Sequence, residues 1–231
     1  MEKELQKRIL SSIILIPLSL FFIIKGSAFF ILFLVILFLI SSSEWLNMVK
    51  KLELKILGIL FLIFSFYSTF YYREMSLEFF LLIIIACVST DLGGYIFGKL
   101  FKGPKLIKIS PNKTYSGMLG GFLLAIIISY LFATKYTPTE VTNNIYTSDL
   151  QFIILILIIS STSQIGDLII SYFKRSSKIK NTGKIFPGHG GMLDRIDGMI
   201  FVFPIIYLLS IIFSWKKKLL FLAQQVQLEN L

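Results

Sequence analysis

The sequence predicts an all-α, polytopic integral membrane protein, and three observations carry this prediction. Hydrophobic residues make up 55% of the 231 residues, whereas a soluble domain usually has about 45–50%. Mean hydropathy is +0.80, and the apolar residues form long uninterrupted runs rather than alternating positions. Charged residues account for only 16% and also occur in blocks. We expect one membrane domain, because no polar stretch is long enough to build a soluble core of its own.

About seven apolar segments approach the roughly 20 residues that a membrane-spanning helix needs. In chain order, they are Ile9–Ile24, Ala28–Ser43, Ile56–Tyr72, Phe79–Phe97, Gly117–Thr134, Leu150–Phe173 and Met199–Trp215. The first follows a basic start but lacks a small-residue cleavage site, so we interpret it as a transmembrane helix and not as a signal peptide. Several segments are short or contain Gly or Pro, which leaves a count of roughly six to eight open.

Two glycine patterns and one cysteine add detail to this arrangement. Gly94 and Gly98 form a small-x-x-x-small pair, as do Gly117 and Gly121, and such pairs favour close packing of helices in membranes. Cys87 is the only cysteine and lies inside an apolar run. A single cysteine excludes an internal disulfide and a cysteine-based metal site.

Basic residues indicate which loops face the cytoplasm. With a cytoplasmic N-terminus, the outside connections contain only Lys25, Arg73 and Lys135, as the positive-inside rule requires. The segment Lys216–Lys218 is the exception, because it follows the last predicted span and would lie outside. A re-entrant pair, an even number of spans, or a late charge cluster that does not determine orientation would each explain it.

Two predicted cytoplasmic loops concentrate the polar residues. One runs from Asp91 to Gly121 and the other from Gly166 to Gly198. Each begins with a carboxylate, Asp91 or Asp167, at the end of an apolar run. A charged group at membrane depth costs free energy, so it marks either a functional site or a structural ion pair. We favour a functional site, with an interfacial ion pair to Lys99 or Lys174 as the alternative.

Three aspartates form a candidate Mg²⁺ site. Asp194 and Asp197 are three residues apart, which places them on one face if the segment is helical. Together with Asp167 they supply carboxylate oxygens, the ligands that Mg²⁺ prefers alongside substrate phosphates. The alternative is that the Asp-x-x-Asp pair is only solvated charge, as most such pairs are in soluble helices.

A glycine-rich segment before these aspartates is suited to phosphate. Within Pro187–Gly191, the small residues Gly188, Gly190 and Gly191 would let backbone N–H groups approach phosphate oxygens closely. His189 either binds substrate or moves a proton there, or is simply a satisfied hydrogen-bonding residue, and the sequence leaves both open. The basic residues that would neutralise phosphate charge are Lys174, Arg175, Lys180 and Arg195. Attraction of these cations to anionic lipid headgroups is the alternative.

This polar region resembles the signature of the phosphatidate cytidylyltransferases, also called CDP-diacylglycerol synthases. The matching residues are Ser171, Lys174, Arg175, Lys180, Pro187–Gly191, Asp194, Arg195 and Asp197. The residues that resemble the other polar region of the family are Asp91, Gly94, Tyr95, Gly98, Lys99 and Ile109–Thr114. The sequence departs from the family pattern at Asn181, where aspartate is usual, and at Tyr115 and Ser116, where a Trp-Glu pair is common. The N-terminal half matches only as generic spans.

The resemblance implies a Mg²⁺-dependent nucleotidyltransferase that converts CTP and phosphatidate to CDP-diacylglycerol and pyrophosphate in phospholipid biosynthesis. The catalytic residues that it implies are Asp167, Lys174, Arg175, His189, Asp194, Arg195 and Asp197. Of these, Asp167, Asp194 and Asp197 would hold the metal, and a second cation stays an open alternative. The substrate-binding residues that it implies are Asp91, Ser110, Lys113, Thr114, Ser171, Lys180, Gly188, Gly190 and Gly191.

On this basis we divide the membrane domain into N-terminal transmembrane helices, 1–90, and a C-terminal catalytic region, 91–231, with a signature loop at 171–198. The expected partners are CTP, phosphatidate and the lipid bilayer, with no nucleic acid and with a homodimer left open. The expected location is the bacterial inner (plasma) membrane, with the active site facing the cytoplasm.

Two other functional classes stay as alternatives. One is a CDP-alcohol phosphotransferase, whose D-G-x-x-A-R pattern breaks off after Asp197 and Gly198. The other is a transporter or channel that uses Asp91 and Asp167 as intramembrane cation sites. No inverted repeat is visible, and the polar residues gather at one face rather than at the midplane, which favours the enzyme.

Overall fold

The computed structural model describes residues 2–107, 110–136, 149–183, 185 and 190–212. Its long helices are α1 (Glu2–Lys25), α2 (Ser27–Met48), α3 (Leu52–Met75), α4 (Leu77–Phe101), α5 (Tyr115–Tyr136) and α7 (Asp149–Ser176). A short helix, α8 (Leu193–Ile196), precedes the helix Met199–Ile212. The predicted helical architecture is confirmed, because every predicted apolar segment falls on a helix within the described residues.

Five described helices, α2, α3, α4, α5 and α7, are long and apolar enough to cross a membrane. The apolar parts of the first and last predicted segments are shorter, Leu15–Lys25 and Met199–Ile212. The fold is thus that of a multi-pass helical membrane protein, and a count of about seven crossings stays a prediction. The segment 216–218, which bears on that count, lies outside the described residues.

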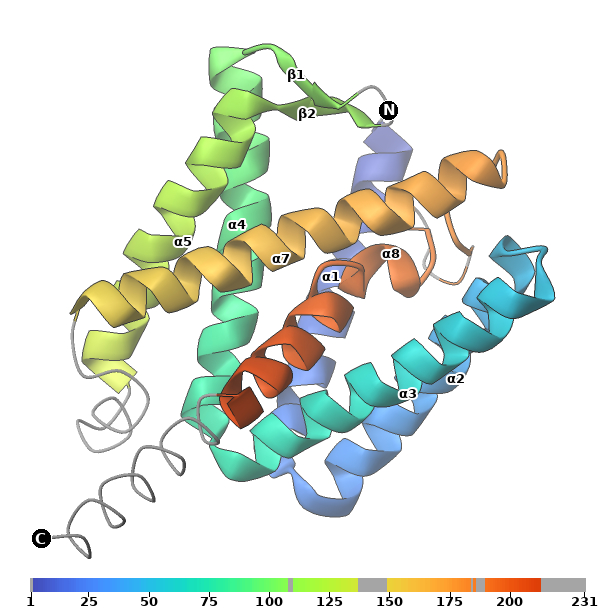
Figure 1. The fold of residues 1–231 in the computed structure, drawn as a ribbon, viewed down its shortest axis with the longest axis horizontal. Helices are drawn as coiled ribbons and strands as arrows, with labels where there is room; N and C mark the ends of the chain where they lie inside the picture. The colour runs from blue at the N-terminus through green and yellow to red at the C-terminus, as the bar shows by residue number, and fades with distance from the viewer. Residues whose placement is uncertain (1, 108–109, 137–148, 184, 186–189, 213–231) are drawn as a thin grey trace, which may run out of the picture.

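The prediction of an all-α fold misses one small hairpin after α4. Strands β1 (Lys105–Ile107) and β2 (Ser110–Thr114) pair antiparallel. The segment is basic, short and contains a proline, features that favour a loop over a strand when only local pattern is considered. The hairpin matters because β2, the strand that contains Lys113 and Thr114, contacts α4 and α5 and leads into α5 (Figure 1).

Helices α4 and α5 run side by side (Figure 1), and glycines set their separation. A Cβ atom added at Gly117 would lie 2.7 Å from the carbonyl oxygen of Gly94, and one added at Gly121 would lie 3.0 Å from that of Thr90. At Gly93 the added atom would collide with the backbone of Gly120. The close packing predicted from the small-residue pairs is therefore present at this contact.

The remaining helices complete a bundle around two apolar clusters. Helix α7 crosses α4 and α5, α2 and α3 pair on the other side, and Met199–Ile212 lies between them (Figure 1). One cluster joins α1, α2, α3, α4, α5, α7 and the last helix around Phe80 and Val202. The other joins α2, α3, α7 and α8 around Trp45 and Leu193. This second cluster attaches the polar region after α7 to the N-terminal helices.

Arg73 of α3 stabilises the turn between α1 and α2 through hydrogen bonds. Gly26 has a φ of 67°, a left-handed conformation that favours glycine. The guanidinium of Arg73 donates to the carbonyl oxygen of Ile23 from Nε and Nη2, at 3.1 and 3.0 Å, and to that of Ile24 at 3.3 Å. Arg73 thus satisfies carbonyl groups that the end of α1 leaves without helical partners.

Candidate active site

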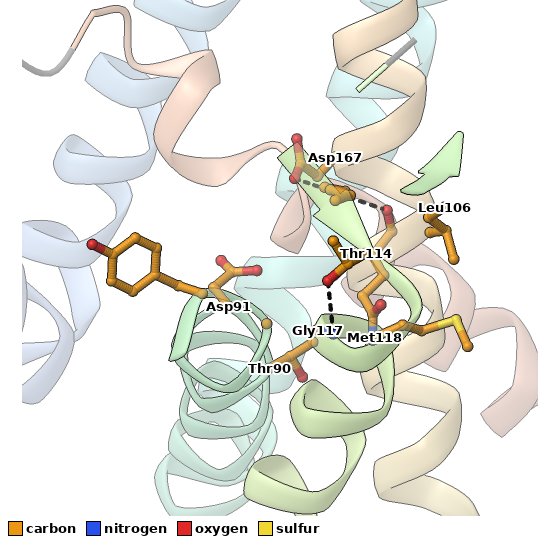
Figure 2. Close-up of a pocket in the computed structure, with 11 residues that line it drawn as sticks. Thr90, Asp91, Leu106, Thr114, Gly117, Met118 and Asp167 are labelled. Carbon is orange, nitrogen blue, oxygen red and sulfur yellow. Dashed lines mark hydrogen bonds and ion pairs between the residues drawn. The ribbon is translucent and has the colours of Figure 1, made fainter. Parts of the chain in front are cut away.

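A polar pocket opens where α4, α5, α7 and the hairpin meet (Figure 2), and its volume is about 220 Å³. Its lining residues are Thr90, Asp91, Gly94, Tyr95, Leu106, Lys113, Thr114, Gly117, Met118, Gln164 and Asp167. Asp91 comes from α4 and Asp167 from α7, so the two predicted membrane-depth carboxylates lie on one cavity. The two halves of the predicted site meet here in space although 76 positions separate these aspartates in the sequence.

The hairpin supplies the cation of this pocket. Lys113 Nζ lies 2.5 Å from Asp167 Oδ2 and donates to the carbonyl oxygen of Gln164 at 3.5 Å. Asp167 is thus paired with Lys113, and not with Lys174 as in the ion-pair alternative. Its other oxygen, Oδ1, accepts from Ser171 Oγ at 3.2 Å. The pocket therefore presents a partly compensated carboxylate and an ammonium group side by side.

Thr114 fixes the hairpin to the start of α5. Its hydroxyl accepts from the backbone N–H of Gly117 at 3.1 Å (Figure 2). The same hydroxyl lies 3.0 Å from Ser116 Oγ. A threonine that accepts from the N–H three residues later is an N-cap, which satisfies one of the unpaired donors of a helix N-terminus. The predicted substrate-binding residue Thr114 thus has a structural partner, and Ser110 lies at the far end of the same strand, opposite Ile107.

Asp197 meets Asp167 from the other side. The backbone comes close because α7 has glycine at 166, where an added Cβ would lie 2.9 Å from the carbonyl oxygen of Asp197. The carboxyl groups of Asp167 and Asp197 lie within hydrogen-bonding distance. Burial, and then the negative charge of Asp167, raise the pKa of Asp197 well above its usual range. Two carboxyl groups in contact favour either a shared proton or a cation.

Asp194 lies in a different environment from the other two predicted metal ligands. Its Oδ1 accepts from Lys174 Nζ at 2.8 Å, and its Oδ2 accepts from the backbone N–H groups of Thr182 at 2.8 Å and Gly191 at 3.0 Å. Burial alone would raise its pKa, but these hydrogen bonds hold the pKa of Asp194 below its usual range. Among the described residues, no group of three or more His, Cys, Asp or Glu side chains is arranged to hold a metal ion.

Glu44 of α2 is a site residue that the sequence analysis did not identify. Its side chain is buried, and its carboxylate accepts from Thr182 Oγ1 at 2.8 Å and from the backbone N–H groups of Met192 at 2.9 Å and Leu193 at 2.8 Å. The signal was available, because Glu44 directly follows the second predicted apolar segment. The argument applied to Asp91 and Asp167, that a carboxylate at membrane depth has a role, applies to it equally.

The other predicted site residues divide into three groups. Gly190 and Gly191 are buried beside Asp194, and Gly190 has a φ of 86° that favours glycine. Arg175 and Lys180 are exposed, on α7 and in the segment that follows it. The segment 186–189, with Gly188 and His189, lies outside the described residues, so those two assignments stay predictions.

A second, larger cavity of about 520 Å³ lies among α1, α2, α3, α4, α8 and the helix Met199–Ile212. Its walls are almost entirely apolar, with residues such as Phe30, Leu34 and Phe203. Arg195 is the only charged residue among its described lining residues. Because Arg195 lies two residues before Asp197, whose carboxyl group interacts with Asp167 of the polar pocket, the cationic end of the apolar cavity lies near that pocket.

Comparisons with known proteins agree with this combination of features. The model of the family described as the cytidylyltransferase family matches residues 52–213. The phosphatidate cytidylyltransferase of Rickettsia felis is 33% identical over 216 residues, which cover 91% of this chain and 94% of that protein. That of Rickettsia conorii is 34% identical over 209 residues, covering 88% and 90%. The Bacillus subtilis protein of the same name is 38% identical over 136 residues, covering 57% of this chain and 48% of its own.

Proposed function

The chain belongs to the cytidylyltransferase family, and we propose that it transfers the cytidylyl group of CTP to phosphatidate, giving CDP-diacylglycerol and pyrophosphate. The relatives named above carry the name phosphatidate cytidylyltransferase. This reaction joins a water-soluble polyanion to a membrane lipid. It therefore needs a polar site and an apolar site that meet.

The observation that carries the proposal is the placement of the two cavities. A pocket with Asp91, Lys113 and Asp167 adjoins Asp197, and Arg195 lies two residues before Asp197 at the border of the apolar cavity. The polar pocket is suited to the nucleoside triphosphate CTP, whereas the apolar cavity is suited to the acyl chains of phosphatidate. In this proposal Arg195 pairs with the lipid phosphate, for which a guanidinium is well shaped.

The reaction requires the protein mainly to position the two substrates and to neutralise their charge. An oxygen of the phosphatidate phosphate attacks the α-phosphorus of CTP, and the bond between the α- and β-phosphates breaks to release pyrophosphate. The attacking oxygen is already anionic, so no general base is required. The main obstacle is repulsion between two anions, and positioning with charge neutralisation lowers that barrier. Lys113 and Arg195 are the cations best placed for it, and Lys174 adds positive potential at Asp167 and Asp197.

We also propose that the enzyme uses Mg²⁺, held by Asp167 and Asp197. These carboxyl groups fit the ion because they lie in contact and their mutual repulsion calls for a positive charge between them. When bound, the ion would neutralise negative charge on the phosphates. Asp194 would join as a ligand only by giving up Lys174 and its two backbone donors. A second cation stays an open alternative.

The site is proposed to face the cytoplasm of the bacterial inner membrane, because CTP is a cytoplasmic nucleotide and the predicted loops around it are basic. The cytidylyltransferase proposal explains each feature of the described residues discussed above. None of these features favours an alcohol phosphotransferase or a transporter instead.

A variant series tests this proposal in purified protein. Asp167→Asn and Asp197→Asn should each reduce the formation of CDP-diacylglycerol about 100-fold or more, because each removes a proposed charge at the reacting phosphates. Asp149→Asn is the matched control, since Asp149 is an exposed aspartate at the opposite end of α7. Near-wild-type rates for both site variants, with the fold intact, would refute the assignment of these two aspartates.

A further inference from the structure

Glu44 makes three hydrogen bonds to the polar segment after α7, from a helix far away in the sequence. Its Oε2 accepts from Thr182 Oγ1 and from the N–H of Leu193, both at 2.8 Å, and its Oε1 accepts from the N–H of Met192 at 2.9 Å. Only 4% of the residue is exposed. The carboxylate thus joins Thr182, on one side of the glycine-rich segment, to Met192 and Leu193 on the other.

The surrounding chain leaves space for this carboxylate. An added Cβ at Gly183 or Gly191 would collide with the Glu44 carboxylate. A second bond anchors the same region to α2, because Ser177 Oγ donates to the carbonyl oxygen of Met48 at 2.6 Å. Gly191 therefore packs directly against the Thr182 hydroxyl and the Glu44 carboxylate, where a larger side chain would displace them.

The bonds of Glu44 end where α8 begins. Met192 and Leu193 lead directly into Arg195, which borders the apolar cavity, and into Asp197, which contacts Asp167. Stability alone is a weak reason to bury a carboxylate, since apolar replacements of buried charged networks are often neutral or stabilising. A fixed position for the start of α8 is what this carboxylate provides.

We propose that Glu44 is a positioning residue of the transfer reaction, which holds α8 so that Arg195 reaches the phosphate of the lipid substrate. The inference rests on the proposed function. Glutamate is suited to the task because both of its oxygens accept, whereas glutamine would present an amide donor to one of the donors already there. Glu44→Gln therefore keeps the size of the side chain and disturbs the bonds.

The test measures KM for phosphatidate, as mole fraction in mixed micelles at saturating CTP and Mg²⁺. Glu44→Gln should raise this KM about 10-fold or more, and Arg195→Gln should raise it as well. Both changes weaken the same contact, the one between Arg195 and the lipid phosphate. The double variant should therefore raise KM by clearly less than the product of the two single effects. A purely structural role would lower the amount of active enzyme and hence the apparent kcat, while KM stayed unchanged.

Arg73→Gln is the matched control, because it breaks another partly buried bridge between distant segments, at the turn after α1. It should lower thermal stability and leave KM for phosphatidate unchanged. If Glu44→Gln does not fold, Thr182→Val tests the inference in its place, since it removes a single hydroxyl donor to Glu44. Thr182→Val should also raise KM for phosphatidate, by a smaller factor.

Three results would overturn the inference: an unchanged KM in Glu44→Gln, single effects that multiply fully in the double variant, or, where Thr182→Val decides, an unchanged KM there. Wild-type protein that forms no CDP-diacylglycerol would instead refute the proposed function, so the two failures are distinguishable.

Discussion

Replacing Lys174 with methionine removes the cation that faces Asp194 beside the glycine-rich segment. The Lys174 and Asp194 side chains are only 12% and 6% exposed, with Nζ and Oδ1 2.8 Å apart, so water screens them little. Removing one partner of a buried pair costs about 3–5 kcal/mol. Asp194 keeps its bonds from Thr182 and Gly191, so we expect the lower end, about 3 kcal/mol. For a chain of this length, that lowers Tm by about 6–12 °C.

Thermal unfolding in detergent, without substrate, measures this loss. Lys50→Met is the matched control because Lys50 is exposed after α2, and its effect should stay within about 0.5 kcal/mol. Equal Tm values for the Lys174 and Lys50 variants would refute the reasoning, since they would show that the pair is not buried.

The same pair predicts a pH dependence with a definite sign. The pKa of Asp194 is lowered in the folded state by the hydrogen bonds that it accepts, which outweigh the effect of burial. A carboxyl with a lowered folded pKa contributes stability above its unfolded pKa, about 3.9, and loses it as the pH falls through the folded pKa. In Lys174→Met, the loss of Tm on acidification below about pH 4 should therefore be smaller than in wild type. An equally steep loss in both proteins would contradict this sign.

Further predictions concern packing, metal and lipid. Gly93→Ala should destabilise the protein by about 1–3 kcal/mol, because the methyl group would collide with the backbone of Gly120; a Tm equal to that of wild type would contradict the contact between α4 and α5. Because the pKa of Asp197 is raised and Mg²⁺ requires the ionised form, the Mg²⁺ concentration for half-maximal activity should fall as the pH rises, and a pH-independent value would count against Asp197 as a ligand. Leu34→Trp should narrow the apolar cavity and raise KM for phosphatidate while leaving KM for CTP unchanged. Equal changes in both constants would argue against a lipid in that cavity.

The helices, and the choice of Asp91 and Asp167 as candidate site residues, could be predicted from the sequence because their signals are local; that the two aspartates line one pocket could not. A run of apolar residues fixes a helix by composition, and a carboxylate at its end is unusual enough to indicate a site. The close packing of α4 against α5 was predictable for the same reason, since the spacing of their glycines alone places them on one helical face.

The partners of Asp194 and the role of Glu44 were not predictable in this way. The spacing of Asp194 and Asp197 suggests one shared face, yet α8 ends at Ile196 and the two carboxyl groups have different neighbours. Glu44 acts on residues that lie 138 to 149 positions further along the chain. Such contacts depend on how α2, α7 and α8 pack, and no local period in the sequence encodes that packing.

The most direct test of the central claim is to follow the α-phosphorus of labelled CTP in purified wild-type protein supplied with phosphatidate and Mg²⁺. The account predicts that the label moves into the lipid phase as CDP-diacylglycerol, with one pyrophosphate released for each lipid formed. Label that stays in the aqueous phase, with CTP intact or hydrolysed to CMP, would contradict it.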